Sequence, residues 1–139
     1  MCRFVPEKNL HHLIEAFVQT KHEGYKLVLA GDTDFEDEYS RNLKAMAKSN
    51  GVILTGFIKG KKLHSLLSNT RCYVLPSSHA NIEVKLKYKN YFEVGNIKEL
   101  TKKLQDNIDT PYQKVEYDMS QYNWDIITNQ VVEIYKSLQ

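Results

Sequence analysis

The sequence predicts an α/β domain with a mainly parallel sheet flanked by helices. Short β-type runs alternate with longer helical patterns along most of the 139 residues, and this alternation is typical of repeated strand–helix–strand units. Residues 27–30 form a continuous apolar run, as expected of a parallel strand covered on both faces. In the longer segments apolar residues recur at spacings of three and four, which indicates helices with one buried face.

Composition and charge are those of a soluble globular protein. A length of 139 residues suits one domain over 1–139, and 42% hydrophobic with 26% charged residues is ordinary for such a domain. The net charge of +2 is too small to indicate a nucleic-acid partner, and no apolar run approaches membrane-spanning length. Cys2 and Cys72 lie in apolar segments without metal-binding spacing. They are expected to be reduced and buried in a cytoplasmic protein, with a disulfide as the alternative.

The first half of the chain is expected to contain three strands and three helices. Pro6 ends the first strand, and Asn9 is placed to cap the first helix. The glycine-led segment 31–34 is expected to form a turn. The expected elements are a strand at 2–5, a helix over 10–18, a strand at 26–30, a helix over 39–47, a strand at 52–54 and a helix over 61–68. In the helix over 61–68, three leucines should face the core: Leu63, Leu66 and Leu67.

The second half departs from this rhythm after His79. A strand at 72–75 is expected to stop at Pro76. The later expected elements are a short helix over 80–86, a strand at 91–94, a helix over 97–107 and a final helix over 124–138.

Five short motifs occur in one order along nearly the whole chain. They are Arg3-Phe4-Val5-Pro6-Glu7-Lys8-Asn9, Lys26-Leu27-Val28-Leu29-Ala30-Gly31-Asp32, Val52-Ile53-Leu54-Thr55-Gly56-Phe57-Ile58, Tyr73-Val74-Leu75-Pro76-Ser77-Ser78, and Tyr122-Asn123-Trp124 followed by Ile134-Tyr135. Each motif alone is a weak signal. Together they resemble the C-terminal, nucleotide-sugar donor domain of the retaining GT-B-fold glycosyltransferases of family 4 (group 1). The resemblance implies a Rossmann-like fold that forms one half of a GT-B enzyme.

The chain departs from the family pattern at two places. Cys2 stands where a glycine is usual, almost no strand precedes it, and the acceptor-binding N-terminal half is absent. After His79 the sequence resembles a later part of the family, as though a helix and a strand were missing; such a crossover takes roughly a dozen residues. The alternatives are a deletion in the gene, a shortened chain, and a mobile segment left out of the sequence. The family's two donor-contacting glutamates belong to this segment, so no catalytic residue is assigned.

By resemblance, Arg3 and Lys8 are expected to bind the diphosphate of a nucleotide-sugar donor. Charge builds on this leaving group as the glycosidic bond breaks, and fixed cations and backbone amides can stabilise it. We therefore expect neither a metal nor a cofactor. The two residues flank a turn at the opening of a helix, whose N-terminus itself favours phosphate. Solvated surface charge is the alternative for both.

Six further residues are expected to border the donor crevice and the nucleobase because they follow predicted strands. In open α/β sheets, ligands bind beyond the carboxyl ends of the strands. The six residues are Gly31, Asp32, Gly56, Phe57, Ile58 and Ser77. The alternatives are a plain turn with Asp32 as a helix cap, and a Phe57 side chain that belongs to the core.

The preferred interpretation is the donor-binding domain of a hexosyltransferase-type enzyme of polysaccharide biosynthesis. The parent enzyme would transfer a sugar from a nucleotide-diphosphate sugar to a glycan, lipid or other acceptor, in the cytoplasm or peripherally at the inner face of the membrane. The chain alone, a fragment, is expected to be inactive. A missing helix and strand would expose a sheet edge, so self-association is also expected. The alternatives are a non-catalytic Rossmann-like remnant with weak or no nucleotide affinity, and a response-regulator-like domain, for which Asp32 lacks the acidic partners.

Overall fold

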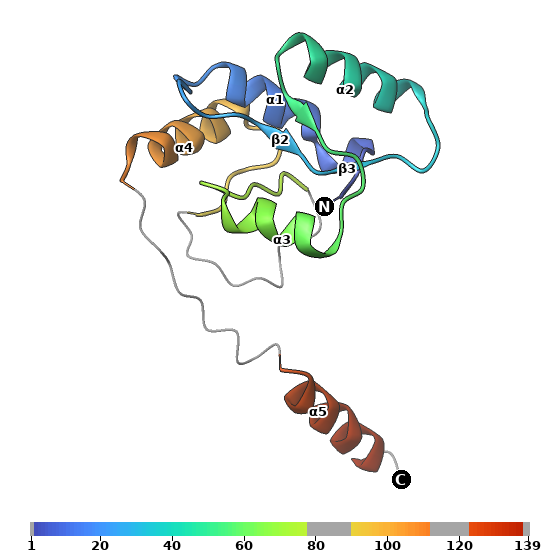
Figure 1. Cartoon of the computed structure of the whole chain (residues 1–139). Coiled ribbons are helices and arrows are strands. Elements are labelled where there is room, and N and C mark those ends of the chain that lie inside the picture. The colour runs from blue at the N-terminus through green and yellow to red at the C-terminus, as the bar shows by residue number, and fades with distance from the viewer. Residues whose placement is uncertain (1, 78–89, 112–122, 138–139) are drawn as a thin grey trace.

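The computed structural model describes residues 2–77, 90–111 and 123–137 and has the expected α/β architecture (Figure 1). The described elements are β1 (Cys2–Arg3), the short 3-10 helix η1 (Pro6–Lys8), α1 (Leu10–Val18), β2 (Val28–Leu29), β3 (Gly31–Asp32), α2 (Glu38–Ser49), β4 (Ile53–Leu54), α3 (Gly60–Ser68), α4 (Ile97–Asp109) and α5 (Trp124–Ser137). Parallel strand pairs flanked by helices confirm the predicted Rossmann-like fold class. The predicted helix over 80–86 lies outside the described residues.

The strands form parallel pairs around one central segment, Val28–Asp32. β1 pairs in parallel with β3, and β2 pairs in parallel with β4. Only one residue separates β2 from β3, so the same segment is bonded to β1 along one edge and to β4 along the other. The amide of Cys2 donates to the Ala30 carbonyl at 3.1 Å, and the amide of Thr55 donates to the Leu29 carbonyl at 3.2 Å. The carboxyl ends of three parallel segments therefore lie at one edge of the sheet.

The core is built around α1, which packs against both α2 and α4. Figure 1 shows these three helices on one side of the strands and α3 on the other. The spacing of three and four residues predicted for this helix is confirmed, because α1 buries five side chains: Leu10, Leu13, Ile14, Ala16 and Phe17. The same core cluster contains Phe4, which follows β1, Leu43 and Ala47 of α2, and Leu100 and Leu104 of α4. Burial of this apolar face is the main force that holds α1 on the sheet.

Side chains fix where two of the helices begin. At α2, Asp37 Oδ1 accepts from the Ser40 amide at 2.7 Å, and Ser40 Oγ accepts from the Asp37 amide at 3.0 Å. This is a capping box, and the hydrogen bond from Ser40 lowers the pKa of the Asp37 carboxyl. At α4, Asn96 Oδ1 accepts from the Glu99 amide at 3.0 Å. Free amides at both helix starts are satisfied in this way.

Two predicted strands do not form. Residues 72–75 and 91–94 run as irregular chain, without strand pairing. Val74 and Phe92 still pack against the core, so their apolar character reflects burial under a loop rather than a place in the sheet. Segment 31–34, expected to be a turn, instead begins with strand β3.

Two side chains predicted to be buried, Leu67 and Cys72, are exposed. Phe57, for which a place in the core was the alternative, is exposed as well; Phe57 and Leu67 each retain 47% of their accessible surface, so neither belongs to the core. Cys72 is also exposed and Cys2 is half-buried, and both thiols are free, as the prediction of reduced cysteines requires. A short amphipathic run predicts burial poorly when no described element packs against it, as is the case beside β4.

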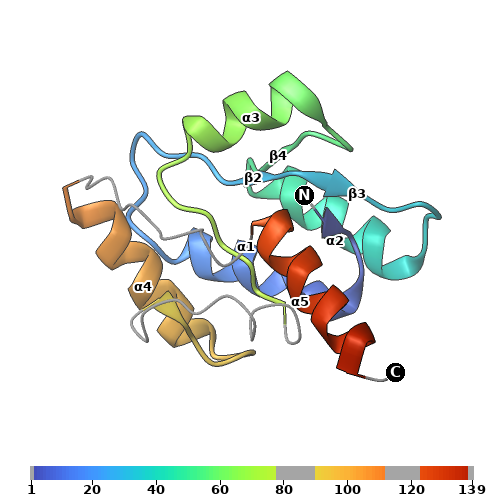
Figure 2. The same cartoon turned by 90° about the horizontal axis from the view of Figure 1, so that it is seen from below.

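Figure 1 shows the last helix, α5, apart from the other described elements, and in the view of Figure 2 it overlaps α1 only because the molecule is seen from below. Its described side chains are exposed except for half-buried Ile127. Within the described part of the chain, no helix combines the length and the apolar character needed to cross a bilayer.

Candidate functional site

Arg3 lies at the carboxyl end of β1, beside Asp32 of β3, its partner in the parallel register. Its Nε lies 3.0 Å from Asp34 Oδ2, and both side chains are largely exposed. An ion pair in this setting contributes little to stability. The guanidinium is therefore at the predicted edge of the sheet, but an acidic partner already engages it.

Lys8 ends η1, five residues after Arg3, and reaches a segment far away in sequence. Its Nζ donates to Ser77 Oγ at 3.4 Å. The neighbouring Asn9 Nδ2 donates to the Pro76 carbonyl at 3.2 Å. Two adjacent residues therefore tie the segment after 72–75 to the first loop, and two predicted site residues, Lys8 and Ser77, are brought into contact.

Gly31 and Gly56 also meet at this edge. The Gly31 amide donates to the Gly56 carbonyl at 3.1 Å, and the two residues form an isolated bridge. Gly31 is buried and has a φ of +147°; a Cβ placed on it would lie 1.8 Å from the carbonyl oxygen of Cys2. The glycine is thus required by the close approach of β1, whatever the ligand.

Asp32 is held by a cation on α2. Lys44 Nζ lies 2.9 Å from Asp32 Oδ1 and 3.1 Å from Glu36 Oε1, and the Thr33 amide donates to the same Asp32 oxygen at 2.8 Å. The hydrogen bond from Lys44, followed by that from Thr33, lowers the pKa of the Asp32 carboxyl. The alternative reading of Asp32 as a helix cap is wrong, because Asp37 caps α2.

The N-terminus of α1 opens beside Lys8. Asn9 occupies the N-cap position with a left-handed φ of 49°, and its side chain makes no capping hydrogen bond to α1. Asn9 therefore occupies the predicted N-cap position but does not cap the helix with its side chain. Its side-chain amide donates to the Pro76 carbonyl instead. The N-terminus of α1 also carries the positive end of the helix dipole, which adds to the positive charge of Lys8.

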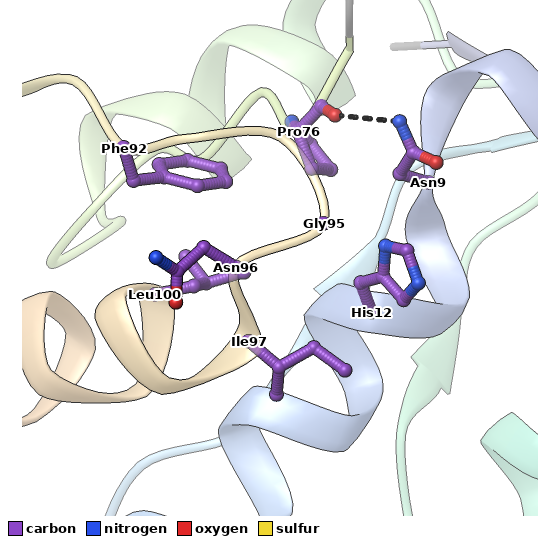
Figure 3. A pocket seen from close by; sticks show the side chains of 8 residues that line it. All are labelled: Asn9, His12, Pro76, Phe92, Gly95, Asn96, Ile97 and Leu100. Carbon is purple, nitrogen blue, oxygen red and sulfur yellow. Dashed lines mark hydrogen bonds between the residues drawn. The ribbon is translucent and has the colours of Figure 1, made fainter.

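A narrow pocket lies next to these contacts, between the start of α1 and the start of α4 (Figure 3). It is too narrow to hold a water molecule. His12 Nδ1 is buried there and has no hydrogen-bond partner among the described residues. His12, Asn96 and Pro76 face this space from three elements that are remote in sequence. The pocket is thus too narrow to be a ligand cavity.

The remaining predicted residues lie beyond β4. Phe57 is exposed in the loop that follows Gly56, and Ile58 is half-buried. The contacts above join Lys8 to Ser77, and they place Arg3, Asp32, Gly31 and Gly56 in a row along the strand ends. Within the described ranges, no group of three or more His, Cys, Asp or Glu side chains could hold a metal ion.

Sequence reasoning did not identify the partners of these residues. Lys44 and Asp34 engage Asp32 and Arg3, and Asn9 holds Pro76. For the first two contacts, the only local signal is the acidic cluster at residues 32–38 together with a lysine nearly two turns into α2. No local pattern predicts a contact between residues separated by 67 positions.

The fold and this edge define a Rossmann-like domain with its candidate residues at the carboxyl ends of parallel strands. A family model described as glycosyl transferases group 1 matches residues 1–84, which is more than half of the chain. The chain therefore belongs to the group 1 glycosyl transferases. Neither the curated proteins nor the solved structures searched gave a significant match.

Proposed function

We propose that this chain is the donor-binding domain of a GT-B-type, family 4 glycosyltransferase, and that Lys8 and Arg3 bind the diphosphate of a nucleotide-sugar. Membership of the group 1 glycosyl transferases carries the proposal, because the matched range 1–84 includes every candidate residue. The parent enzyme would transfer a hexosyl group to a glycan, lipid or other acceptor held largely by another domain.

The surroundings of the two cations give them different roles in this proposal. Among the described residues, Lys8 contacts a neutral hydroxyl and pairs with no carboxylate, and the start of α1 adds its partial positive charge. Arg3 is paired with a carboxylate, so a diphosphate has to compete with Asp34 for the guanidinium. Lys8 is therefore the principal anchor, and Arg3 binds once Asp34 is displaced.

These groups also suit the chemistry of the leaving group. The departing diphosphate gains negative charge as the glycosidic bond breaks, and cations already positioned at the sheet edge stabilise that charge without reorganisation. Gly31 and Gly56 bring backbone close to the same edge without side chains in the way. The nucleobase would lie toward Gly56 and Phe57, at the far end of the row.

Calorimetric titration of the whole chain with uridine and guanosine diphosphates tests the proposal. We expect binding that falls at least tenfold in Lys8→Ala, since a charge-assisted contact is lost. Lys48→Ala, which removes an exposed lysine from the last turn of α2, is the matched control and should leave the affinity unchanged. Asp34→Asn frees Arg3 and should tighten binding.

Two results would overturn the proposal. A folded protein that binds neither nucleotide at millimolar concentration would be the non-catalytic remnant instead. Binding that is indifferent to Lys8→Ala and Asp34→Asn would place the nucleotide elsewhere. Turnover of a nucleotide-sugar by the purified chain would separately contradict the expectation that it is inactive alone.

A further inference from the structure

The side chain of Asn9 is used outside its own helix. At the N-cap position of a helix, a side-chain oxygen usually accepts from the first helical amides. Asn9 makes no such bond to α1. Its Nδ2 instead donates to the Pro76 carbonyl at 3.2 Å and, at the longer distance of 3.5 Å, to the Glu7 carbonyl. Figure 3 shows the amide directed across to Pro76. The side chain at the helix start therefore contacts a residue 67 positions away.

Tyr39 of α2 supplies an acceptor at the start of α1. Its hydroxyl lies 3.0 Å from His11 Nδ1. Burial raises the pKa of this hydroxyl, and hydrogen bonds from the backbone amides of His11 and Leu10 act in the opposite direction. The first amides of α1 thus have a partner other than Asn9. The contact of Asn9 with Pro76 does not leave the helix start without an acceptor.

The Asn9 contact holds the buried end of a segment that belongs to no described strand. Tyr73 is 60% exposed, whereas Ser77 retains only 6% of its accessible surface. The Ser77 hydroxyl accepts from Lys8 Nζ at 3.4 Å. Two adjacent residues of the first loop therefore hold two adjacent residues of this segment, Lys8 with Ser77 and Asn9 with Pro76.

This arrangement orders a lysine that can still bind an anion. An ammonium group has three N–H donors, and among the described residues Lys8 uses one of them, on Ser77. The other two can bind an anion. A lysine side chain loses much rotamer freedom when it is ordered. A chain in which Ser77 already holds Lys8 should therefore bind an anion more tightly than one in which the lysine is ordered only on binding.

We propose that Asn9 is a positioning residue for the binding of a nucleotide diphosphate. By holding the Pro76 carbonyl it keeps Ser77 against Lys8, and so keeps the Lys8 ammonium in place for the diphosphate. Asn9 does not itself contact the ligand. This inference rests on the proposed function, since it requires that Lys8 binds the donor.

Asn9→Gly removes the side-chain amide with little other disturbance, because glycine adopts the φ of 49° freely. We expect calorimetric titration with uridine and guanosine diphosphates to show an affinity that is about two- to tenfold lower, as the loss of one hydrogen bond produces. Asn50→Gly is the matched control. It removes a similar bond, from Asn50 Nδ2 to the Met46 carbonyl at 2.8 Å, at the end of α2, and should leave the affinity unchanged.

A double-mutant cycle with Lys8→Ala separates positioning from a general effect on the fold. Asn9→Gly should weaken binding when Lys8 is present and have no further effect when it is alanine. Ser77→Ala removes the acceptor of Lys8 directly and should weaken binding by a similar factor. Amide hydrogen exchange of residues 72–77 needs no ligand, and it should become faster in Asn9→Gly but not in Asn50→Gly.

The outcomes distinguish this role from the donor site itself. Unchanged affinity in Asn9→Gly, equal losses with and without Lys8, or unchanged exchange of residues 72–77 would each overturn the positioning role and leave the donor site standing. A wild-type chain that binds neither nucleotide fails at the first titration, which overturns the proposed function and this role together.

Discussion

Gly31→Ala is expected to be among the most damaging single substitutions in the domain. The added Cβ would lie 1.8 Å from the Cys2 carbonyl oxygen and 2.9 Å from its carbonyl carbon. Real contacts of this kind are not shorter than 3.0 Å, so β1 has to move away by more than 1 Å. The neighbour is backbone, which cannot rotate aside as the end of a side chain can.

The magnitude follows from what that movement breaks. Two backbone hydrogen bonds join β1 to the central segment, from Cys2 to Ala30 at 3.1 Å and from Phe4 to Asp32 at 2.9 Å, and each contributes about 1 kcal/mol. The φ of +147° adds about 1–3 kcal/mol for any residue with a Cβ. The total, about 3–5 kcal/mol, is a large part of the stability of a small domain, which is about 5–15 kcal/mol.

Urea unfolding of the whole chain measures this loss, with Gly51→Ala as the matched control. Gly51 also has a positive φ, +65°, but nothing lies within 4 Å of its added Cβ. Its substitution should cost only the backbone term of about 1–2 kcal/mol. If Gly31→Ala lowers the free energy of unfolding no more than Gly51→Ala does, the close approach of β1 to the central strand is refuted.

Two further substitutions test the core and the edge. Ile14→Ala should lower the free energy of unfolding by about 2–5 kcal/mol in a urea titration, because Ile14 is 0% exposed; the exposed Val18→Ala should change it little, and equal effects would contradict the placement of α1. Asp32→Asn should lower the melting temperature at pH 6 but not at pH 2. The Asp32 carboxyl has a lowered pKa in the folded state, so its contribution is present above the ordinary value of 3.8 and is lost as the pH falls through the lowered one. A melting-temperature difference that persists at pH 2 would show that Lys44 is not the cause.

Periodicity predicted α1, α2 and α4 well because each of them has a single buried face. The apolar residues of α1 at spacings of three and four are the ones that pack against α2 and α4, and α5 begins at Trp124 as expected. The strands were harder to predict because each described strand has only two residues. Val74 and Phe92 show the limit: an apolar run predicts burial, but only pairing with a neighbour makes it a strand.

The candidate site was predictable as a set of residues but not as a set of contacts. Arg3 and Lys8 could be named from the resemblance to the glycosyltransferase family, and Gly31 and Gly56 because strand ends in an α/β sheet converge on one edge. The ion pairs of Arg3 with Asp34 and of Lys44 with Asp32 depend on rotamers and helix orientation, which no local pattern encodes. The roles proposed for these residues, and the expected self-association, remain predictions.

The ties from Lys8 and Asn9 give residues 76–77 a fixed position in the domain. Any chain that continues from Ser77 therefore sets out from the rim where the diphosphate is proposed to bind, and not from a freely moving end. Residues inserted at this point would therefore lie close to that rim. The same anchoring makes this position a suitable place at which to graft a segment intended to grip a sugar.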